Sequence, residues 1–144
     1  MPIRLAVFSF DVRIAMPSES GFGASDGILL GFFLGGAMDI VQLGSAELKA
    51  WMDEGRMFCL LDVRTDEETA VCSLPNALHI PMNLIPLRQN ELPDDVPLVV
   101  YCHHGIRSLH TAMYLADAGF ENLYNLQGGI DAWAAEIDGN MMRY

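Results

Sequence analysis

The sequence predicts an α/β fold, a small parallel β-sheet flanked by helices on both faces. Short apolar segments alternate with segments of helical periodicity along most of the chain, which is typical of this class. Glycines and capping residues separate the two kinds of segment. The best strand candidate, Leu98-Val99-Val100-Tyr101, is apolar at every position, as expected for the interior of a parallel sheet.

Helices and short strands are predicted before this central strand. We expect Ser45 to cap the first helix and Gly55 to end it. Thr65 and Glu68 have the spacing of a capping box, which indicates the start of a second helix. The predicted ranges are 45–54 for a helix, 58–61 for a strand, a short helix after 65, 77–80 for a strand and 85–91 for a weak helix.

After the central strand, the pattern predicts a helix, a strand and a last helix. The first of these helices begins at Ser108, has apolar residues at helical spacing, and ends at Gly119. A short strand follows at 123–126, then a turn at Gly128-Gly129 and a helix at 130–137.

The 144 residues provide for one domain with a single core. Residues 1–37 have no sustained period and are rich in glycine and serine, so we expect a poorly ordered N-terminal extension. Residues 38–144 are predicted to form the domain, and Met38 is a candidate for the natural start of the protein.

Composition argues against several classes of partner. The formal charge of −11 and the lack of a basic stripe disfavour nucleic acid and anionic membrane surfaces. No apolar segment reaches the roughly 18 residues of a membrane span, and we expect no export signal. Three cysteines without CxxC spacing indicate a reducing compartment, so a cytoplasmic location is expected.

Cys102 is the candidate nucleophile. It directly follows the central strand, where ligands bind in parallel sheets, and precedes a helix N-terminus, which favours an anion. Gly105 permits the short loop to curl so that backbone N–H groups surround the sulfur, which favours the reactive thiolate. The predicted anion-binding residues are His103, His104, Gly105, Ile106, Arg107 and Ser108.

The chain resembles the rhodanese family, in particular its single-domain members, over roughly 41–133. Four segments carry the resemblance: Leu61-Asp62-Val63-Arg64, Ala77-Leu78-His79-Ile80-Pro81, the loop within 99–108, and Leu126-Gln127-Gly128-Gly129-Ile130-Asp131-Ala132-Trp133. Two segments depart from the family pattern. Cys72-Ser73-Leu74 stands where the family has Gly-His-Ile, and Asn76 and His79 replace a glycine and an asparagine.

The resemblance implies a sulfurtransferase whose Cys102 takes sulfur from thiosulfate or a similar small anionic donor and carries it as a persulfide. Cyanide, a thiol or a protein would accept the sulfur, and neither an organic cofactor nor a metal is expected. One alternative is a persulfide relay with little thiosulfate turnover. A phosphatase-like hydrolase is less favoured, because four residues separate Cys102 from Arg107 and the loop of cysteine phosphatases has five.

Several residues have competing interpretations. Arg107 binds an anion or forms a salt bridge with a carboxylate. His103 and His104 are expected to line the pocket rim, since adjacent histidines rarely converge on one metal ion. Cys72 is weighed as a resolving thiol against a structural role. Three further residues are interpreted as structural: Cys59 in the core, and Asp62 and Arg64 beside the site.

Overall fold

The computed structural model describes residues 40–144, and within this range five parallel strands form one sheet in the order β1-β5-β4-β2-β3. The strands are β1 (Val41–Leu43), β2 (Cys59–Asp62), β3 (Leu78–His79), β4 (Leu98–Tyr101) and β5 (Leu123–Leu126). Every strand pairing is parallel, which confirms the predicted fold class. The expected N-terminal extension, residues 1–37, lies outside the described residues, so the boundary at residue 38 stays a prediction.

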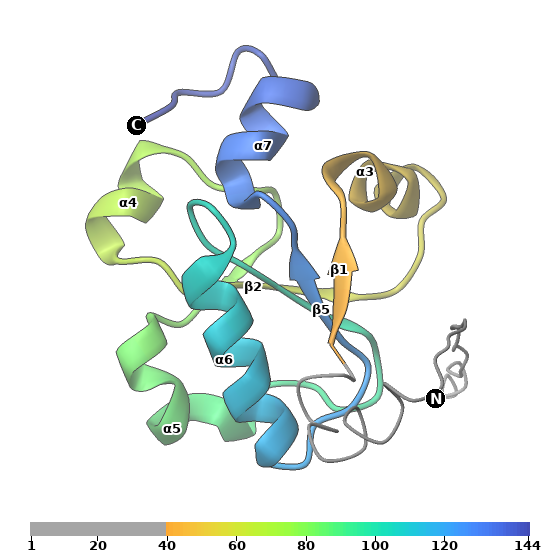
Figure 1. Cartoon of the computed structure of the whole chain (residues 1–144), viewed down its shortest axis with the longest axis vertical. Coiled ribbons are helices and arrows are strands. Elements are labelled where there is room, and N and C mark those ends of the chain that lie inside the picture. The colour runs from red at the N-terminus through yellow and green to blue at the C-terminus, as the bar shows by residue number, and fades with distance from the viewer. Residues whose placement is uncertain (1–39) are drawn as a thin grey trace, which may run out of the picture.

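Helices cover both faces of the sheet (Figure 1). α5 and α6 lie over one face, and α3 and α7 lie over the other. α4 follows β2 at the carboxyl end of the sheet. The bounds are α3 (Ser45–Asp53), α4 (Asp66–Val71), α5 (Ile85–Arg88), α6 (Ile106–Asp117) and α7 (Gly129–Glu136), with 3-10 turns η2 (Met82–Leu84) and η3 (Gln89–Glu91) on either side of α5.

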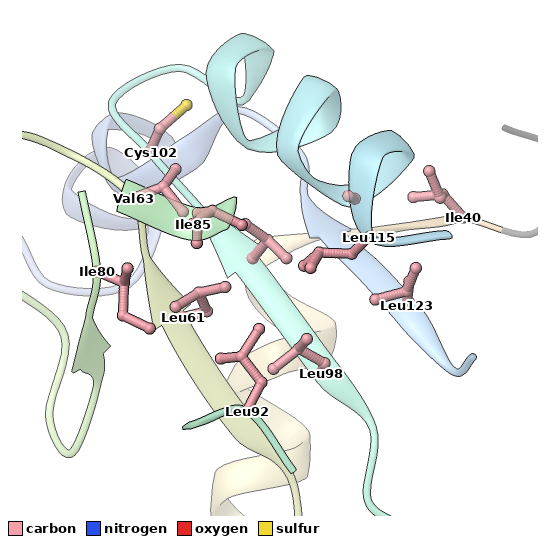
Figure 2. Close-up of a cluster of buried hydrophobic side chains, with 12 residues drawn as sticks. Ile40, Leu61, Val63, Ile80, Ile85, Leu92, Leu98, Cys102, Leu115 and Leu123 are labelled. Carbon is pink, nitrogen blue, oxygen red and sulfur yellow. The ribbon is translucent and has the colours of Figure 1, made fainter. Parts of the chain in front are cut away.

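The hydrophobic core has one cluster on each face of the sheet, and β4 supplies both. Leu98 and Val100 belong to the cluster under α5 and α6, which Figure 2 shows. Val99 and Tyr101 belong to the cluster under α3 and α7. Successive residues of a strand face opposite sides of the sheet. Since helices cover both faces, all four side chains are buried. The prediction that this apolar segment is an interior strand is therefore confirmed.

The N-terminal part of the described chain differs most from the sequence prediction. β1 was not predicted, since two of its three residues are exposed and the polar Gln42 breaks the apolar pattern. It forms by pairing with the distant β5. The expected cap at Ser45 is wrong, because Gly44 occupies the N-cap and its backbone N–H donates to Glu47 Oε1 at 2.9 Å.

The weak helix expected at 85–91 ends three residues early, as α5 at Arg88, and the 3-10 turn η3 covers 89–91. The other boundaries lie within two residues of expectation, and glycine caps account for the shifts of α6 and α7. α6 begins at Ile106 instead of Ser108, because Gly105 adopts a left-handed conformation at its N-cap. Gly128 does the same for α7. The predicted capping box is confirmed, since the side chains of Thr65 and Glu68 each accept a hydrogen bond from the other residue's backbone N–H.

Candidate active site

Cys102 directly follows β4, the middle strand of the sheet, at the carboxyl edge where parallel sheets bind ligands. The residue is 1% exposed. Figure 2 shows its sulfur at the end of the cluster under α5 and α6, beside the loop that leads into α6. The central strand therefore occupies the position that the sequence predicted, whereas the loop after it ends two residues earlier than predicted, because α6 begins at Ile106.

Backbone N–H groups converge on the Cys102 sulfur. Gly105 N donates to Sγ at 3.1 Å, and Ser108 N donates at 3.4 Å. Ser108 lies in the first turn of α6, whose partial positive end therefore faces the sulfur. Fixed donors of this kind stabilise a negative charge at the position they surround. The loop thus forms an anion cradle, defined here as the N–H groups of Gly105 and Ser108.

Gly105 is required in this loop for two reasons. Its φ of +101° lies in the left-handed region that side chains disfavour. A Cβ at this position would also lie 3.2 Å from both Gly128 N and Leu126 O, which are backbone atoms and cannot move aside easily. The loop therefore packs directly against the strand and turn that precede α7.

Beneath the sulfur, a buried hydrogen-bond chain leads from the loop into β5. The Cys102 thiol donates to Ser108 Oγ at 3.4 Å, and Ser108 Oγ donates in turn to Asn125 Oδ1. Asn125 Nδ2 donates to Gly105 O at 3.1 Å and to Gln42 Oε1 at 3.0 Å. Asn125 is 2% exposed and supports the loop from below. Sequence reasoning missed it, although a lone asparagine within an apolar strand was a visible signal.

The N-terminus of α7 holds the other side of the loop. Ile130 N donates to Cys102 O at 2.9 Å, and Asp131 N donates to His103 O at 3.1 Å. Gly129 permits this approach, since a Cβ there would collide with the same two carbonyl groups. N–H groups of α7 thus bind the carbonyls of Cys102 and His103, whereas the N–H groups of Gly105 and Ser108 point at the sulfur.

Arg107 does not point into the cradle but forms a salt bridge with Glu68 of α4. Its two terminal nitrogens donate to the two carboxylate oxygens at 2.7 and 2.9 Å. The salt-bridge interpretation therefore describes this structure, and anion binding by Arg107 stays a prediction. Hydrogen bonding from Arg107 holds the pKa of Glu68 well below its usual value, against the opposing effect of burial.

Tyr144 connects this salt bridge to the loop. Its hydroxyl donates to Glu68 Oε2 at 2.9 Å and accepts from Arg64 Nη1 at 3.0 Å. Its ring stacks on His103 with centroids 3.9 Å apart. Burial raises the pKa of Tyr144 to about 12, so the hydroxyl remains a donor at neutral pH. Nothing in the sequence pattern indicated this residue.

Asp62 and Arg64 form a buried ion pair under the site. Arg64 donates to both carboxylate oxygens of Asp62, at 2.9 and 2.7 Å, and is 0% exposed. Arg64 also donates to Cys72 O at 2.7 Å, and Tyr101 donates to Asp62 Oδ2 at 2.9 Å. These bonds fix the segment around α4 to the sheet. They confirm the structural role predicted for both residues.

His103 and His104 lie at the rim, with Asp131 beside them. The atoms of these three residues that can bind a metal lie within 4.8 Å of one another. Ligands at about 2 Å from a tetrahedral ion stand roughly 3.3 Å apart, so the side chains would have to move closer. The two rings are in contact, with centroids 3.9 Å apart and planes tilted by 32°, and Asp131 already accepts from Arg143. Burial, and then repulsion by His104, lowers the pKa of His103.

Within residues 40–144, the hydrogen bonds of the Cys102 sulfur involve neither Ile106 nor the other two cysteines. Ile106 is 66% exposed beside the cradle. Cys59 packs against the cluster under α5 and α6, and burial raises its thiol pKa, in agreement with a core role. Cys72 packs against the opposite cluster, and Arg64 Nη1 donates to its sulfur at 4.0 Å. A resolving role for Cys72 stays a prediction.

Comparison with known proteins identifies the family. The rhodanese-like domain family matches residues 45–136. The chain belongs to the rhodanese-like domain family. A sulfurtransferase of Allochromatium vinosum is 40% identical over 93 residues, which cover 65% of this chain and 87% of that protein. A thiosulfate sulfurtransferase of Coxiella burnetii, GlpE, is 33% identical over 62% of this chain and 85% of its own length.

A solved structure supports the same assignment. The rhodanese-like domain protein of Staphylococcus aureus superposes with a TM-score of 0.63 at 34% identity, over 72% of this chain and 98% of that one. Sulfur transfer is thus the general activity that the rhodanese-like family and its named relatives indicate. Within residues 40–144, the rhodanese-like domain has no helix with the length and apolar character to cross a membrane.

Proposed function

We propose that the chain is a sulfurtransferase that carries sulfane sulfur as a persulfide on Cys102. The observation that carries this proposal is the convergence of Gly105 N and Ser108 N on the Cys102 sulfur. Such a cradle favours the thiolate as nucleophile and also the anionic terminal sulfur of a persulfide. His103, His104, Ile106 and Arg107 border the cradle and are proposed to contact the donor.

With thiosulfate as donor, the reaction has two steps. The Cys102 thiolate attacks the outer sulfur of thiosulfate, a sulfur–sulfur bond forms on Cys102, and the bond to the sulfonate breaks with release of sulfite. In the second step cyanide or a thiolate attacks the terminal sulfur and leaves the Cys102 thiolate. This ping-pong sequence needs neither a metal nor an organic cofactor.

Sulfur uptake and turnover test the proposal together. The protein is incubated with thiosulfate, its intact mass is recorded, and thiocyanate is measured after addition of cyanide. We expect a gain of one sulfur atom and thiocyanate formation in the wild type, and neither in Cys102→Ser. Cys59→Ser and Cys72→Ser serve as matched controls that keep both. Uptake that persists in Cys102→Ser would contradict the proposal, and phosphatase activity on an aryl phosphate without uptake would favour a hydrolase.

A persulfide relay is the second candidate function. It is favoured by the 1% exposure of Cys102 and by the engagement of Arg107 with Glu68, which leaves a small anion without that cation. In this alternative a protein persulfide is the main donor and a partner protein accepts the sulfur. Rapid uptake from a persulfidated protein, with slow thiosulfate turnover, would distinguish the relay from a thiosulfate sulfurtransferase.

A further inference from the structure

The positive side chains near the cradle are paired with carboxylates. In the described range 40–144, Arg64 binds Asp62 at 2.7 Å, and Arg143 binds Asp131 at 2.9 Å. Arg107, in the first turn of α6, binds Glu68. The whole chain carries a formal charge of −11. A small dianion that approaches Cys102 therefore meets a net negative field with its nearest cations already neutralised.

Glu68 is held firmly in this pairing. Its Oε1 accepts from Arg107 and, at 3.2 Å each, from the backbone and hydroxyl of Thr65. Its Oε2 accepts from Arg107 and Tyr144. The side chain is 18% exposed. α4 and Tyr144 fix the carboxylate on two sides. If Arg107 turned toward a substrate, this fixed carboxylate would lose both hydrogen bonds from the guanidinium.

Arg107 remains within electrostatic reach of Cys102. The hydrogen bond to Glu68 is the main factor that raises the pKa of Arg107, and the charge of Cys102 adds to it. Loss of the charge on Glu68 would leave the positive charge of Arg107 uncompensated and make the potential at the sulfur more positive. An uncompensated Arg107 would attract a donor in proportion to the donor's negative charge.

We propose that Glu68 is a specificity-determining residue that withholds Arg107 from small anions, so that the Cys102 site disfavours dianionic donors relative to less charged ones. This inference rests on the proposed function. It adds to that function the class of donor: sulfane sulfur on a monoanionic or neutral carrier is preferred over the dianion thiosulfate.

Thiosulfate and methanethiosulfonate both donate a sulfane sulfur but differ in net charge. Thiosulfate carries two negative charges and leaves sulfite, whereas methanethiosulfonate carries one and leaves methanesulfinate. In both reactions the Cys102 thiolate attacks the sulfane sulfur, one sulfur–sulfur bond forms and one breaks, and the total charge is conserved. For a ping-pong enzyme, kcat/KM of the donor reports this first half-reaction alone.

The test compares Glu68→Gln with Glu67→Gln, using both donors with cyanide as acceptor. Glutamine at position 68 keeps an acceptor oxygen for Thr65 N, and so the capping box, but removes the charge. Its amide nitrogen replaces the oxygen that accepts from Tyr144. Glu67 is exposed on the same helix, and its variant makes the same change in net charge. We expect Glu68→Gln to raise kcat/KM about tenfold for thiosulfate and about threefold for methanethiosulfonate, because the gain scales with donor charge. Glu67→Gln should change either value less than about twofold, since water and salt screen an exposed charge.

A double variant and the dependence of kcat/KM on salt test the inference independently. The double variant Glu68→Gln/Arg107→Gln should lose the gain, because position 107 then carries no positive charge. In the wild type, sodium chloride should raise kcat/KM for thiosulfate more than for methanethiosulfonate, because salt screens the repulsion of the dianion. A fall of kcat/KM with salt is what an available Arg107 would produce, and it would contradict the inference. This measurement needs no variant and therefore stands even if Glu68→Gln is unstable. Equal gains for the two donors, or no gain beyond that of Glu67→Gln, also overturn it. Failure of wild-type Cys102 to take up sulfur from either donor would instead overturn the proposed function.

Discussion

At the scale of single residues, the cradle depends on Gly105, because any side chain at this position would strain the backbone and contact neighbouring backbone atoms. Gly105 donates to the sulfur and packs against backbone atoms around Gly128. Sequence reasoning identified Cys102, Gly105 and Ser108 because their relation is local. It missed the supporting Asn125, and it recognised Glu68 only as a capping residue. The partners of these two, Ser108 and Arg107, lie 17 and 39 residues away in the sequence.

We predict that Gly105→Ala destabilises the protein more than Gly119→Ala. Both glycines have a left-handed φ, +101° and +103°, but only the Cβ at position 105 would meet backbone atoms. The backbone strain should cost about 1–2 kcal/mol at either site, and the contact at 105 roughly 1–3 kcal/mol more. Urea denaturation measures the difference, and the rate of Cys102 alkylation should fall for Gly105→Ala alone. Equal effects would show that space at the loop is not limiting.

At the scale of elements, the short helix α4 provides a capping box and also carries the carboxylate that pairs with Arg107. Its six residues contain no buried side chain, so packing contributes little to its stability. The capping box of Thr65 and Glu68 starts the helix, and the same Glu68 reaches Arg107 at the start of α6. The sequence pattern was sufficient to predict the cap. It contained no signal for β1, which exists only because β5 supplies its hydrogen-bond partners.

Removal of the cap should therefore destabilise α4 and disturb the salt bridge. We predict that Thr65→Ala lowers the free energy of unfolding by about 1 kcal/mol, because Glu68 N loses its acceptor. Thr69→Ala is the control, since the Thr69 hydroxyl only adds a bond to Thr65 O within the same helix. Its effect should be a few tenths of a kcal/mol in urea denaturation. A larger loss for Thr69→Ala than for Thr65→Ala would argue against the cap.

At the scale of the whole molecule, acid should weaken the fold through Glu68. Its pKa in the folded protein lies below that of an unfolded chain, about 4.3, so its contribution is complete above roughly pH 5 and is lost as the pH falls further. We predict that the wild type exceeds Glu68→Gln by about 1 kcal/mol at pH 7, after allowance for solvent screening. The difference should shrink between pH 5 and 3, whereas Glu67→Gln should follow the wild type. A gap that does not change with pH would exclude this linkage.

The pairing of β1 with β5 has a consequence for the order in which the protein forms. Asn125, which supports the cysteine loop, lies in β5 and binds Gln42 of β1, 83 residues earlier in the chain. α7, which holds the loop carbonyls, follows β5. During synthesis we therefore expect the loop around Cys102 to lack its supports until residues 123–131 have left the ribosome. These long-range contacts should also make folding slower than in a helical protein of equal size. Until then, we expect the N–H groups around the Cys102 sulfur to be held less rigidly than in the folded protein.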